Sequence, residues 1–223
     1  MKEQIVKINS IRLITHDVLQ IVTEKPERFE FTPGQATEIS INKDGWKDEK
    51  RPFTFTSLPL DKYLQFTIKI YPAHNGVTSE FRHLQEKDEL ILHDVFGAIT
   101  YKEEGLFIAG GAGVTPFISI FRYLHSKNDL GNNKLIFANK TKNDIILEKE
   151  FDLMLGKNFI NILSDEKTDK YFHGMITKDF LRNHITGISQ YVYLCGPPPM
   201  MEAVEKFLSD LQIDESLIVR EAF

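Results

Sequence analysis

The chain has 223 residues, of which 42% are hydrophobic and 26% are charged, and its formal net charge is −5. This composition is ordinary for a globular protein of one large domain or two modest ones. The acidic balance argues against nucleic-acid binding and does not favour an anionic membrane. The single cysteine, Cys195, excludes an intrachain disulfide and a four-cysteine iron–sulfur cluster. We expect no membrane span, signal peptide or metal site, and a cytoplasmic location.

The first part of the chain has the pattern of an antiparallel sheet. Short β-rich runs at 5–14, 18–22 and 36–41 are separated by turn residues. Residues 64–70 alternate between apolar and polar side chains, which predicts a half-buried strand. A short helix at 79–85 and a strand at 89–95 follow. Several strands with one small helix predict a closed or nearly closed β-barrel.

The pattern changes between residues 98 and 105, after which apolar strands alternate with amphipathic helices. This alternation predicts an α/β domain with a parallel sheet. We therefore expect two domains, at 1–99 and 104–223. The predicted strands are 106–109, 134–138, 159–163, 191–195 and 217–219, and the predicted helices are 116–125, 144–155, 177–184 and 199–211.

A glycine-rich turn joins the first of these strands to the first helix. Gly110, Gly111 and Gly113 allow a sharp turn and a close approach of a ligand to the backbone. Thr115 and Pro116 then have the residue types of an N-cap and a first helical position. Free N–H groups at such a helix start would hold a phosphate. A plain strand-to-helix connection is the alternative, because the usual third glycine and the following acidic residue are absent.

Two stretches of the first part carry candidate chemistry. Arg51–Ser57 reads RPFTFTS, in which Arg51 suits a phosphate, Phe53 a flat ring, and Thr54 a ring nitrogen. The alternative is an ordinary edge strand. Asn75–Ser79 reads NGVTS and offers backbone N–H groups to a second anion, or else a simple helix cap at Thr78 or Ser79.

A third stretch, Tyr191–Met200, reads YVYLCGPPPM. It brings Cys195 and Gly196 to the carboxyl end of a strand, where open α/β sheets bind ligands. We therefore expect Cys195 and Gly111 to face one crevice. The alternative is a buried structural cysteine.

In this order, the stretches resemble the ferredoxin–NADP⁺ reductase family of flavoproteins over nearly the whole chain. Arg51-Pro52-Phe53-Thr54 is similar to the flavin motif, with Phe in place of Tyr, and Gly76–Ser79 to the flavin pyrophosphate loop. Phe96-Gly97 is similar to the end of the last barrel strand. Gly110–Pro116 resembles the nicotinamide-dinucleotide pyrophosphate loop, and Cys195–Pro198 the motif beside the nicotinamide. The terminal Glu221-Ala222-Phe223 is similar to the Glu-x-Tyr end of plant-type reductases, so stacking would be kept while phenol hydroxyls are lost.

The resemblance implies an NAD(P)H-dependent oxidoreductase that passes electrons through bound FAD, or FMN, to a separate ferredoxin, flavodoxin or oxygenase component. It implies that two pyrophosphate sites bring flavin and nicotinamide together between barrel and sheet. It implies catalytic roles for Thr54, Cys195 and Glu221. The implied cofactor-binding residues are Arg51, Pro52, Phe53, Thr54, Ile68, Tyr71, Gly76, Val77, Thr78, Ser79, Gly110, Gly111, Gly113, Thr115, Pro116, Ser164, Asp165, Cys195, Gly196, Pro197, Met200 and Phe223.

Ser164-Asp165 occupies the place where NADPH-specific relatives carry Ser-Arg. A carboxylate there accepts ribose hydroxyls and repels a 2′-phosphate, which favours NADH. Lys140, Lys167 and Lys170 are near in sequence and could reverse this preference. Two other functions stay open, namely a reductase of free flavin and a redox-sensing module that binds flavin and nucleotide without turnover. The absence of a histidine near Cys195 in the sequence argues against a cysteine hydrolase.

Overall fold

The computed structural model describes residues 3–71 and 76–221. Contacts group the chain into two units, Met1–Thr100 with Thr115–Tyr123, and Tyr101–Val114 with Leu124–Phe223. Among the described residues, no helix has both the length and the hydrophobicity needed to cross a membrane.

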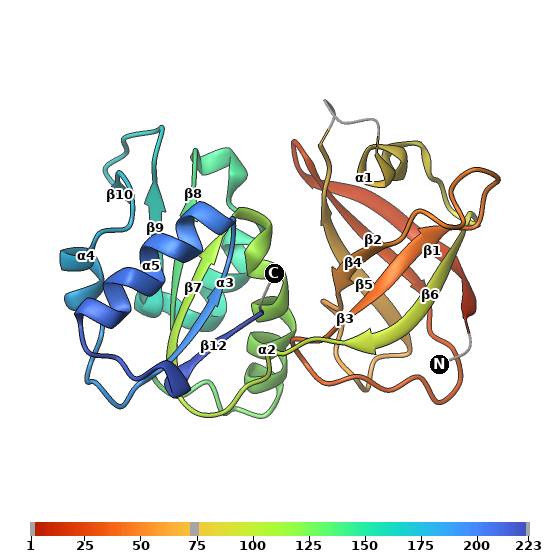
Figure 1. The fold of residues 1–223 in the computed structure, drawn as a ribbon. Coiled ribbons are helices and arrows are strands. Elements are labelled where there is room, and N and C mark those ends of the chain that lie inside the picture. The colour runs from red at the N-terminus through yellow and green to blue at the C-terminus, as the bar shows by residue number, and fades with distance from the viewer. Residues whose placement is uncertain (1–2, 72–75, 222–223) are drawn as a thin grey trace. The chain divides into compact units, whose positions relative to one another are not determined.

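The first unit is an antiparallel sheet of six strands in the order β4-β3-β6-β1-β2-β5 (Figure 1). Its end strands are joined by a bridge between Phe55, which follows β4, and Phe66 of β5. This bridge closes the sheet and confirms the predicted antiparallel barrel. The strands are β1 (Gln4–Thr15), β2 (Val18–Glu24), β3 (Ala36–Ile41), β4 (Arg51–Thr54), β5 (Tyr63–Lys69) and β6 (Glu89–Phe96).

Aromatic side chains fill the barrel core. Phe55, Phe66 and Phe81 are fully buried, and Phe31 stacks on Phe55 with ring centroids 4.3 Å apart. The apolar face of β5 is buried as its alternation predicted.

The expectation that β5 is only half buried is wrong, because Gln65 and Thr67 on its polar face are 7% and 5% exposed. Their side chains meet Thr56, whose hydroxyl lies 3.0 Å from Gln65 Nε2 and 3.2 Å from Thr67 Oγ1. Sequence alternation could not reveal this long-range polar cluster.

Residues 115–123 of helix α2 (Thr115–Ser126) belong to the first unit. The Gly34 N–H donates to Ser119 Oγ at 3.0 Å, and Arg122 Nη1 donates to the Thr56 carbonyl at 2.6 Å. Gly34 has φ +99°, and a Cβ there would lie 2.2 Å from the Ile99 carbonyl oxygen. The Arg122 bond places α2 beside Thr56, whose hydroxyl contacts the polar side chains of β5.

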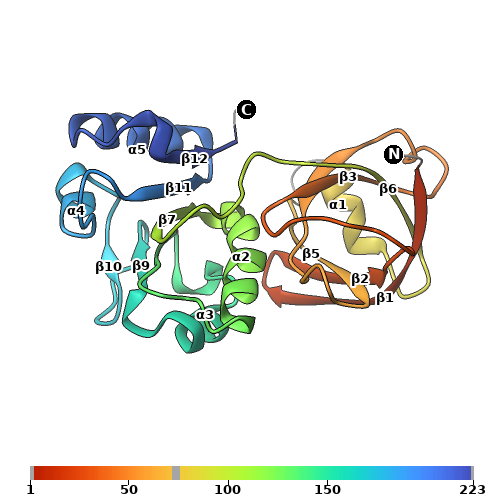
Figure 2. The same cartoon turned by 90° about the horizontal axis from the view of Figure 1, so that it is seen from below.

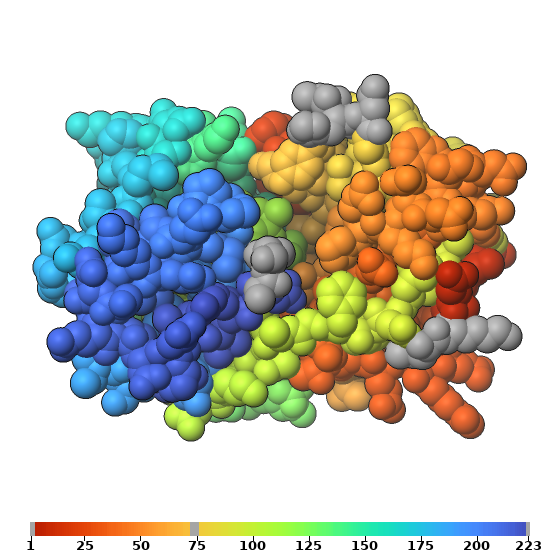
Figure 3. Space-filling model, viewed as in Figure 1, coloured from red at the N-terminus to blue at the C-terminus, as the bar shows by residue number. Residues whose placement is uncertain are grey.

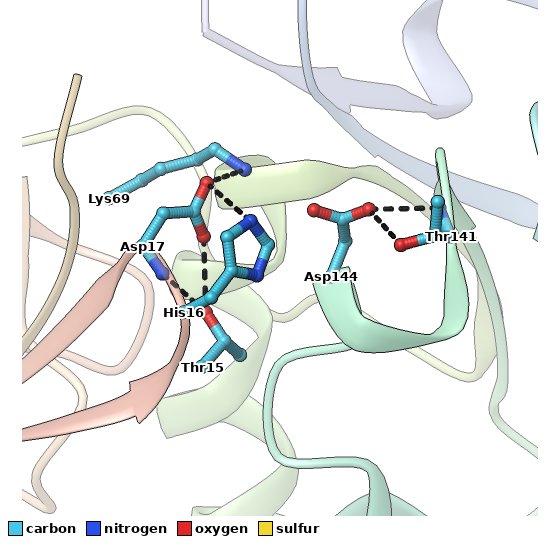
Figure 4. Close-up of polar contacts among 6 residues, drawn as sticks. All are labelled: Thr15, His16, Asp17, Lys69, Thr141 and Asp144. Atoms are coloured by element: carbon cyan, nitrogen blue, oxygen red, sulfur yellow. Dashed lines mark hydrogen bonds and ion pairs between the residues drawn. The ribbon is translucent and has the colours of Figure 1, made fainter. Parts of the chain in front are cut away.

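The turn between β1 and β2 is fixed by a small polar cluster (Figure 4). Thr15 Oγ1 donates to Asp17 Oδ1 at 3.1 Å, and the Lys69 ammonium lies 2.8 Å from Asp17 Oδ2. The hydrogen bond fixes the turn, and the ion pair holds the start of β2 against the end of β5.

The second unit is a sheet of six strands in the order β10-β9-β8-β7-β11-β12, and every pairing is parallel. This confirms the predicted α/β domain. The chain moves outward from β7 through β8 and β9, then returns to place β11 on the other side of β7. The switch point of the sheet is therefore between the carboxyl ends of β7 and β11. The strands are β7 (Gly105–Gly110), β8 (Lys134–Asn139), β9 (Phe159–Leu163), β10 (Phe172–His173), β11 (Tyr191–Cys195) and β12 (Ile218–Arg220).

Helices cover both faces of this sheet (Figure 2). Phe151 of α3 (Glu148–Leu155) contacts Phe159 on one face, with ring centroids 5.4 Å apart. On the other face, α4 (Lys178–Arg182) and α5 (Pro198–Asp210) bury Leu181, Val204 and Leu208 against the strands. The outward side of α5 forms part of the surface of this unit (Figure 3, deep blue).

Two helices differ from the prediction, one in its first residue and the other in its length. The helix expected over 144–155 starts at Glu148, because Lys142–Asp144 forms a 3₁₀ turn and Leu147 has φ +53°. Asp144 closes that turn by accepting from the Thr141 N–H at 2.8 Å and hydroxyl at 2.7 Å (Figure 4). The helix expected over 79–85 is α1 (Val77–Glu80) followed by a 3₁₀ turn at Phe81–His83.

Candidate functional site

The glycine loop leaves β7 as a 3₁₀ turn, η2 (Gly111–Val114), that runs directly into α2. Gly111 has φ +51°, a conformation that favours glycine, and a Cβ there would meet no atom within 4 Å. A Cβ on Gly113 would lie 2.3 Å from the Cys195 carbonyl oxygen. Gly113 is thus required for close packing, whereas Gly111 presents its backbone to open space.

The turn after β11 packs against the start of this loop. A Cβ on Gly110 would lie 2.7 Å from Met200 Sδ and 2.8 Å from Pro197 Cδ. A Cβ on Gly196 would lie 2.5 Å from Met200 Cε. Two motifs that are about 85 residues apart in the sequence therefore form one surface at the switch point of the sheet.

Cys195 is 8% exposed at the end of β11. Burial, with a smaller contribution from the negative charge of Glu221, raises the pKa of its thiol to about 12. The thiol therefore stays protonated at neutral pH and is a poor nucleophile, which agrees with the argument against a cysteine hydrolase. Phe223 lies outside the described residues.

Ser164 and Asp165 follow β9 at the same edge of the sheet. The Ser164 hydroxyl donates to Asp165 Oδ1 at 2.5 Å, and the Asp165 N–H donates to the Lys140 carbonyl at 2.9 Å. The side chain of Asp165 is exposed. Its backbone is thus fixed beside the end of β8 while its carboxylate faces solvent.

A charged cluster that the sequence did not predict joins the end of the loop at residues 164–171 to α3. Lys170 Nζ lies 2.9 Å from Glu148 Oε1 and 3.3 Å from Asp152 Oδ2, both on α3. The Tyr171 hydroxyl also donates to Glu148. The Lys170 ammonium is therefore already paired with carboxylates. Acidic residues one turn apart in the predicted helix were the available signal.

In the first unit, the predicted flavin motif occupies β4. Arg51 is exposed, with its guanidinium 3.5 Å from Glu49 Oε2, and Pro52 is exposed beside it. Phe53 is half-buried and meets the edge of Phe81 at a centroid distance of 5.3 Å. Thr54 is half-buried and accepts a hydrogen bond from the Thr115 hydroxyl at 3.4 Å.

The predicted pyrophosphate loop precedes and forms α1. Gly76 is the N-cap and no side chain caps this helix, so the alternative of a Thr78 or Ser79 cap is wrong. A Cβ on Gly76 would meet no atom within 4 Å. Arg82, which sequence reasoning missed, donates to Ser79 Oγ at 2.9 Å and adds a positive charge beside the loop.

The remaining predicted residues of this unit differ in exposure. Ile68 is 1% exposed within the barrel core, so a ligand would reach its backbone rather than its side chain. Tyr71 is 46% exposed just after β5. Val77 is buried, and Pro116 follows Thr115 in the first turn of α2.

The donor sets fit the two expected cofactors. In the second unit, the open backbone at Gly111 and the N–H groups of η2 are suited to a pyrophosphate, and the Asp165 carboxylate to a ribose. In the first unit, Arg51, the half-buried ring of Phe53 and the open loop at Gly76 are suited to a phosphate-bearing flat ring.

Two family models match the chain. One, described as an FAD-binding domain, matches residues 3–135, which is more than half of the chain. The chain belongs to the ferredoxin–NADP⁺ reductase family. The other, an oxidoreductase NAD-binding domain, matches residues 107–206. The chain is accordingly a flavin- and nicotinamide-binding member of this oxidoreductase family.

Two relatives with oxidoreductase names are similar to most of this chain. The chain is 29% identical to NADH-cytochrome b5 reductase 2 of Mycosarcoma maydis, covering 91% of this chain and 65% of that protein. It is 29% identical to the reductase component of propane 2-monooxygenase of Mycolicibacterium smegmatis, covering 97% of this chain and 66% of that protein. The chain thus spans slightly less than two thirds of the length of these relatives.

Two solved structures have the same fold over nearly their whole length. The FAD/NAD-binding domain of nitric oxide dioxygenase from Vibrio cholerae matches with a TM-score of 0.87 at 21% identity, covering 99% of this chain and 98% of that one. A ferredoxin NADP⁺ reductase from Neisseria gonorrhoeae matches with a TM-score of 0.84 at 17% identity, with the same coverage of both chains. These two similarities concern the fold of the ferredoxin–NADP⁺ reductase family.

Proposed function

We propose that this chain takes electrons from a reduced nicotinamide dinucleotide, through bound FAD, and delivers them singly to a separate acceptor protein. The observation that carries the proposal is the packing of the Gly110–Gly113 loop against the Cys195–Gly196 turn at the switch point of the sheet. The acceptor would be a ferredoxin, a flavodoxin or an oxygenase component, and relatives named as reductase or electron transfer components of oxygenases support the last of these.

We assign flavin binding to the first unit. Arg51 would bind a phosphate oxygen, the Phe53 ring would lie against the flavin, and the backbone of Gly76–Ser79 would hold the pyrophosphate. Bound FAD would supply the ability to accept two electrons at once and release them one at a time. Thr54 would orient the ring system by a hydrogen bond from its hydroxyl. Tyr71, Ile68 and Phe223 remain proposed flavin contacts. FMN in place of FAD is the alternative that flavin identification would decide.

We assign nicotinamide-dinucleotide binding to the second unit, with Thr115 and Pro116 at the start of α2. The backbone of Gly111 and Gly113 would bind the pyrophosphate. Cys195 would pack against the nicotinamide as a protonated thiol, and its burial would exclude water from that side. Glu221, whose charge affects Cys195, would stabilise positive charge or move a proton nearby. Gly196, Pro197 and Met200 would form the wall behind the nicotinamide.

We propose NADH as the preferred donor. The exposed Asp165 carboxylate would accept hydrogen bonds from ribose hydroxyls and repel a 2′-phosphate. Of the three lysines that could reverse this preference, Lys140, Lys167 and Lys170, Lys170 is paired with Glu148 and Asp152. The names of two relatives, both NADH-cytochrome b5 reductases, support the same preference.

Anaerobic titration of the purified protein with NADH and NADPH, followed by flavin absorbance, tests the proposal. We expect a yellow protein that is bleached at lower concentrations of NADH than of NADPH. Bleaching should then reverse on addition of an oxidised ferredoxin or flavodoxin. A yellow protein that neither nucleotide bleaches would instead support a sensing role. A colourless protein that oxidises NADH only with added flavin would support a free-flavin reductase.

A further inference from the structure

Asn139 is the last residue of β8 and is 8% exposed. Neither its side-chain nitrogen nor its side-chain oxygen has a hydrogen-bond partner among the described residues. Buried polar groups in proteins are nearly always hydrogen-bonded, because removing an amide from water without a new partner is costly. The Asn139 carboxamide is thus suited to a partner that binds at this place.

The sheet register puts Asn139 between the two elements already assigned to the dinucleotide. Ala138 pairs with Gly110 of β7, and Asn139 pairs with Leu163 of β9. The main-chain carbonyl oxygen of Asn139 accepts a hydrogen bond from the Ser164 N–H at 3.0 Å. Asn139 therefore lies between the glycine loop on one side and the loop that bears Asp165 on the other.

The side chain of Asn139 lies on the same face of the sheet as that of Phe137, and η2 lies close to β8. Paired residues of parallel strands point to the same face, and side chains alternate along each strand. Phe137 pairs with Ala109, and Asn139 is two residues further along β8.

The loop that follows Asn139 satisfies its polar groups locally. The Thr141 N–H and hydroxyl both donate to Asp144, and the Lys142 N–H donates to Glu166 Oε2 at 2.7 Å. The loop is thereby fixed without the Asn139 side chain, which is left with one donor group and one acceptor to offer.

We propose that the Asn139 carboxamide binds the adenylate half of the nicotinamide dinucleotide, an inference that rests on the proposed function of this site. Its NH₂ group would donate to a phosphate oxygen, and its oxygen would accept from a ribose hydroxyl. An amide offers both groups without a net charge, which avoids the desolvation cost of a lysine at so buried a position. The residue is thus a binding contact between the pyrophosphate loop and Asp165.

ADP is a suitable probe, because it carries the adenylate half without the nicotinamide. Titration calorimetry of the purified protein with ADP would compare wild type, Asn139→Leu and Asn161→Leu. Asn161 of β9 is a matched control, because it is 4% exposed, its side-chain oxygen also lacks a partner among the described residues, and it pairs with Phe137. We expect Asn139→Leu to weaken ADP binding at least tenfold and Asn161→Leu to change it less than twofold, with flavin content retained in both.

Asn139→Asp keeps the shape of the side chain and adds a negative charge, so it serves if the leucine variant does not fold. It should weaken ADP binding more than adenosine binding, because only ADP carries phosphates. Equal ADP affinity in wild type and folded Asn139→Leu would overturn the inference, as would equal losses in Asn139→Leu and Asn161→Leu. Failure of the wild type to bind ADP would also overturn it. Reduction of the wild-type flavin by NADH is measured separately. If Asn139 does not contribute to ADP binding, flavin reduction by NADH would still support the proposed reductase function.

Discussion

Gly113 and Cys195 touch through their backbones, since a Cβ on Gly113 would lie 2.3 Å from the Cys195 carbonyl oxygen. One residue belongs to the turn after β7 and the other ends β11, the strand that pairs with β7. The contact joins the glycine loop to the Cys195 turn, the two motifs that the sequence predicts to face one crevice. Because the neighbour is backbone rather than a flexible side chain, this contact does not tolerate a larger residue.

Gly113→Ala should therefore destabilise the protein by about 2–4 kcal/mol, the range of severe packing faults in a core. It should also weaken nucleotide binding, because relief of the clash displaces η2. Gly111→Ala is the matched control, since its Cβ would meet no atom within 4 Å and only its φ of +51° is unfavourable. We expect Gly111→Ala to cost about 1 kcal/mol. Urea unfolding of the two variants measures the difference, and equal losses would show that the Cys195 contact is unimportant.

The parallel sheet and the barrel could be predicted because strands buried on both faces are continuously apolar and strands buried on one face alternate between apolar and polar residues. Strands β7, β9 and β11 are short apolar runs, and β5 alternates. The two-residue strand β10 was missed because Phe172 and His173 are both exposed and carry no pattern. The start of α3 was misplaced because the Thr141–Asp144 capping box closes a 3₁₀ turn rather than the helix itself.

Polar residues inside the fold were harder to anticipate than apolar ones. Gln65 and Thr67 are buried by partners far away in the chain, which no local pattern reports. Likewise, the strand predicted at 134–138 ends one residue before Asn139, and its apolar pattern does not report a buried amide. The glycine-rich turn between β7 and α2 could be predicted from its composition, whereas the pairing of Lys170 with two carboxylates depends on the tertiary structure.

The Cys195 thiol should resist alkylation in the folded protein. Raising its pKa from the ordinary 9.0 to about 12 lowers the thiolate fraction at pH 8. Labelling by iodoacetamide should then be roughly a thousandfold slower than in the urea-unfolded chain. Mass spectrometry of timed reactions gives both rates. Similar rates in the two states would mean that the thiol ionises freely.

The raised pKa of the Cys195 thiol also predicts how the stability of the protein depends on pH. Above about pH 9 the unfolded thiol loses its proton, whereas the folded thiol keeps its proton until about pH 12, so the unfolded state is favoured as pH rises. Between pH 8 and pH 10 the wild type should lose about 1 kcal/mol more stability than Cys195→Ala. Urea unfolding at both pH values measures this, and parallel losses in the two proteins would contradict it.

Asp165→Asn should shift the donor preference towards NADPH. Removing the carboxylate removes repulsion of the 2′-phosphate and leaves a weaker ribose acceptor. The ratio of kcat/KM for NADPH to that for NADH should rise about tenfold, equivalent to roughly 1.4 kcal/mol. Asp169→Asn, an exposed acid in the same loop, is the control and should leave the ratio unchanged. A ratio that moves equally in both variants would point to the overall charge of the loop instead.

Phe53→Ala should weaken flavin retention about tenfold, because it removes the half-buried ring proposed to lie against the flavin. Phe53→Tyr keeps the ring and should retain flavin as the wild type does. The ratio of flavin to protein absorbance after dialysis reports the difference. If alanine and tyrosine retain flavin equally, the ring at position 53 does not contact it.

Cys195→Ala should slow reduction of the flavin by NADH about tenfold or more while leaving NADH affinity within a few-fold. The physical reason is positional, because a buried thiol that stays protonated contributes shape and exclusion of water rather than proton transfer. Cys195→Ser restores similar volume and should recover part of the rate, whereas Glu221→Gln tests the neighbouring charge separately. Stopped-flow absorbance gives the rate of reduction at saturating NADH, and the dependence on NADH concentration gives the affinity. An unchanged rate in Cys195→Ala would remove this side chain from the positioning of the nicotinamide, and a loss confined to affinity would make it a binding residue alone.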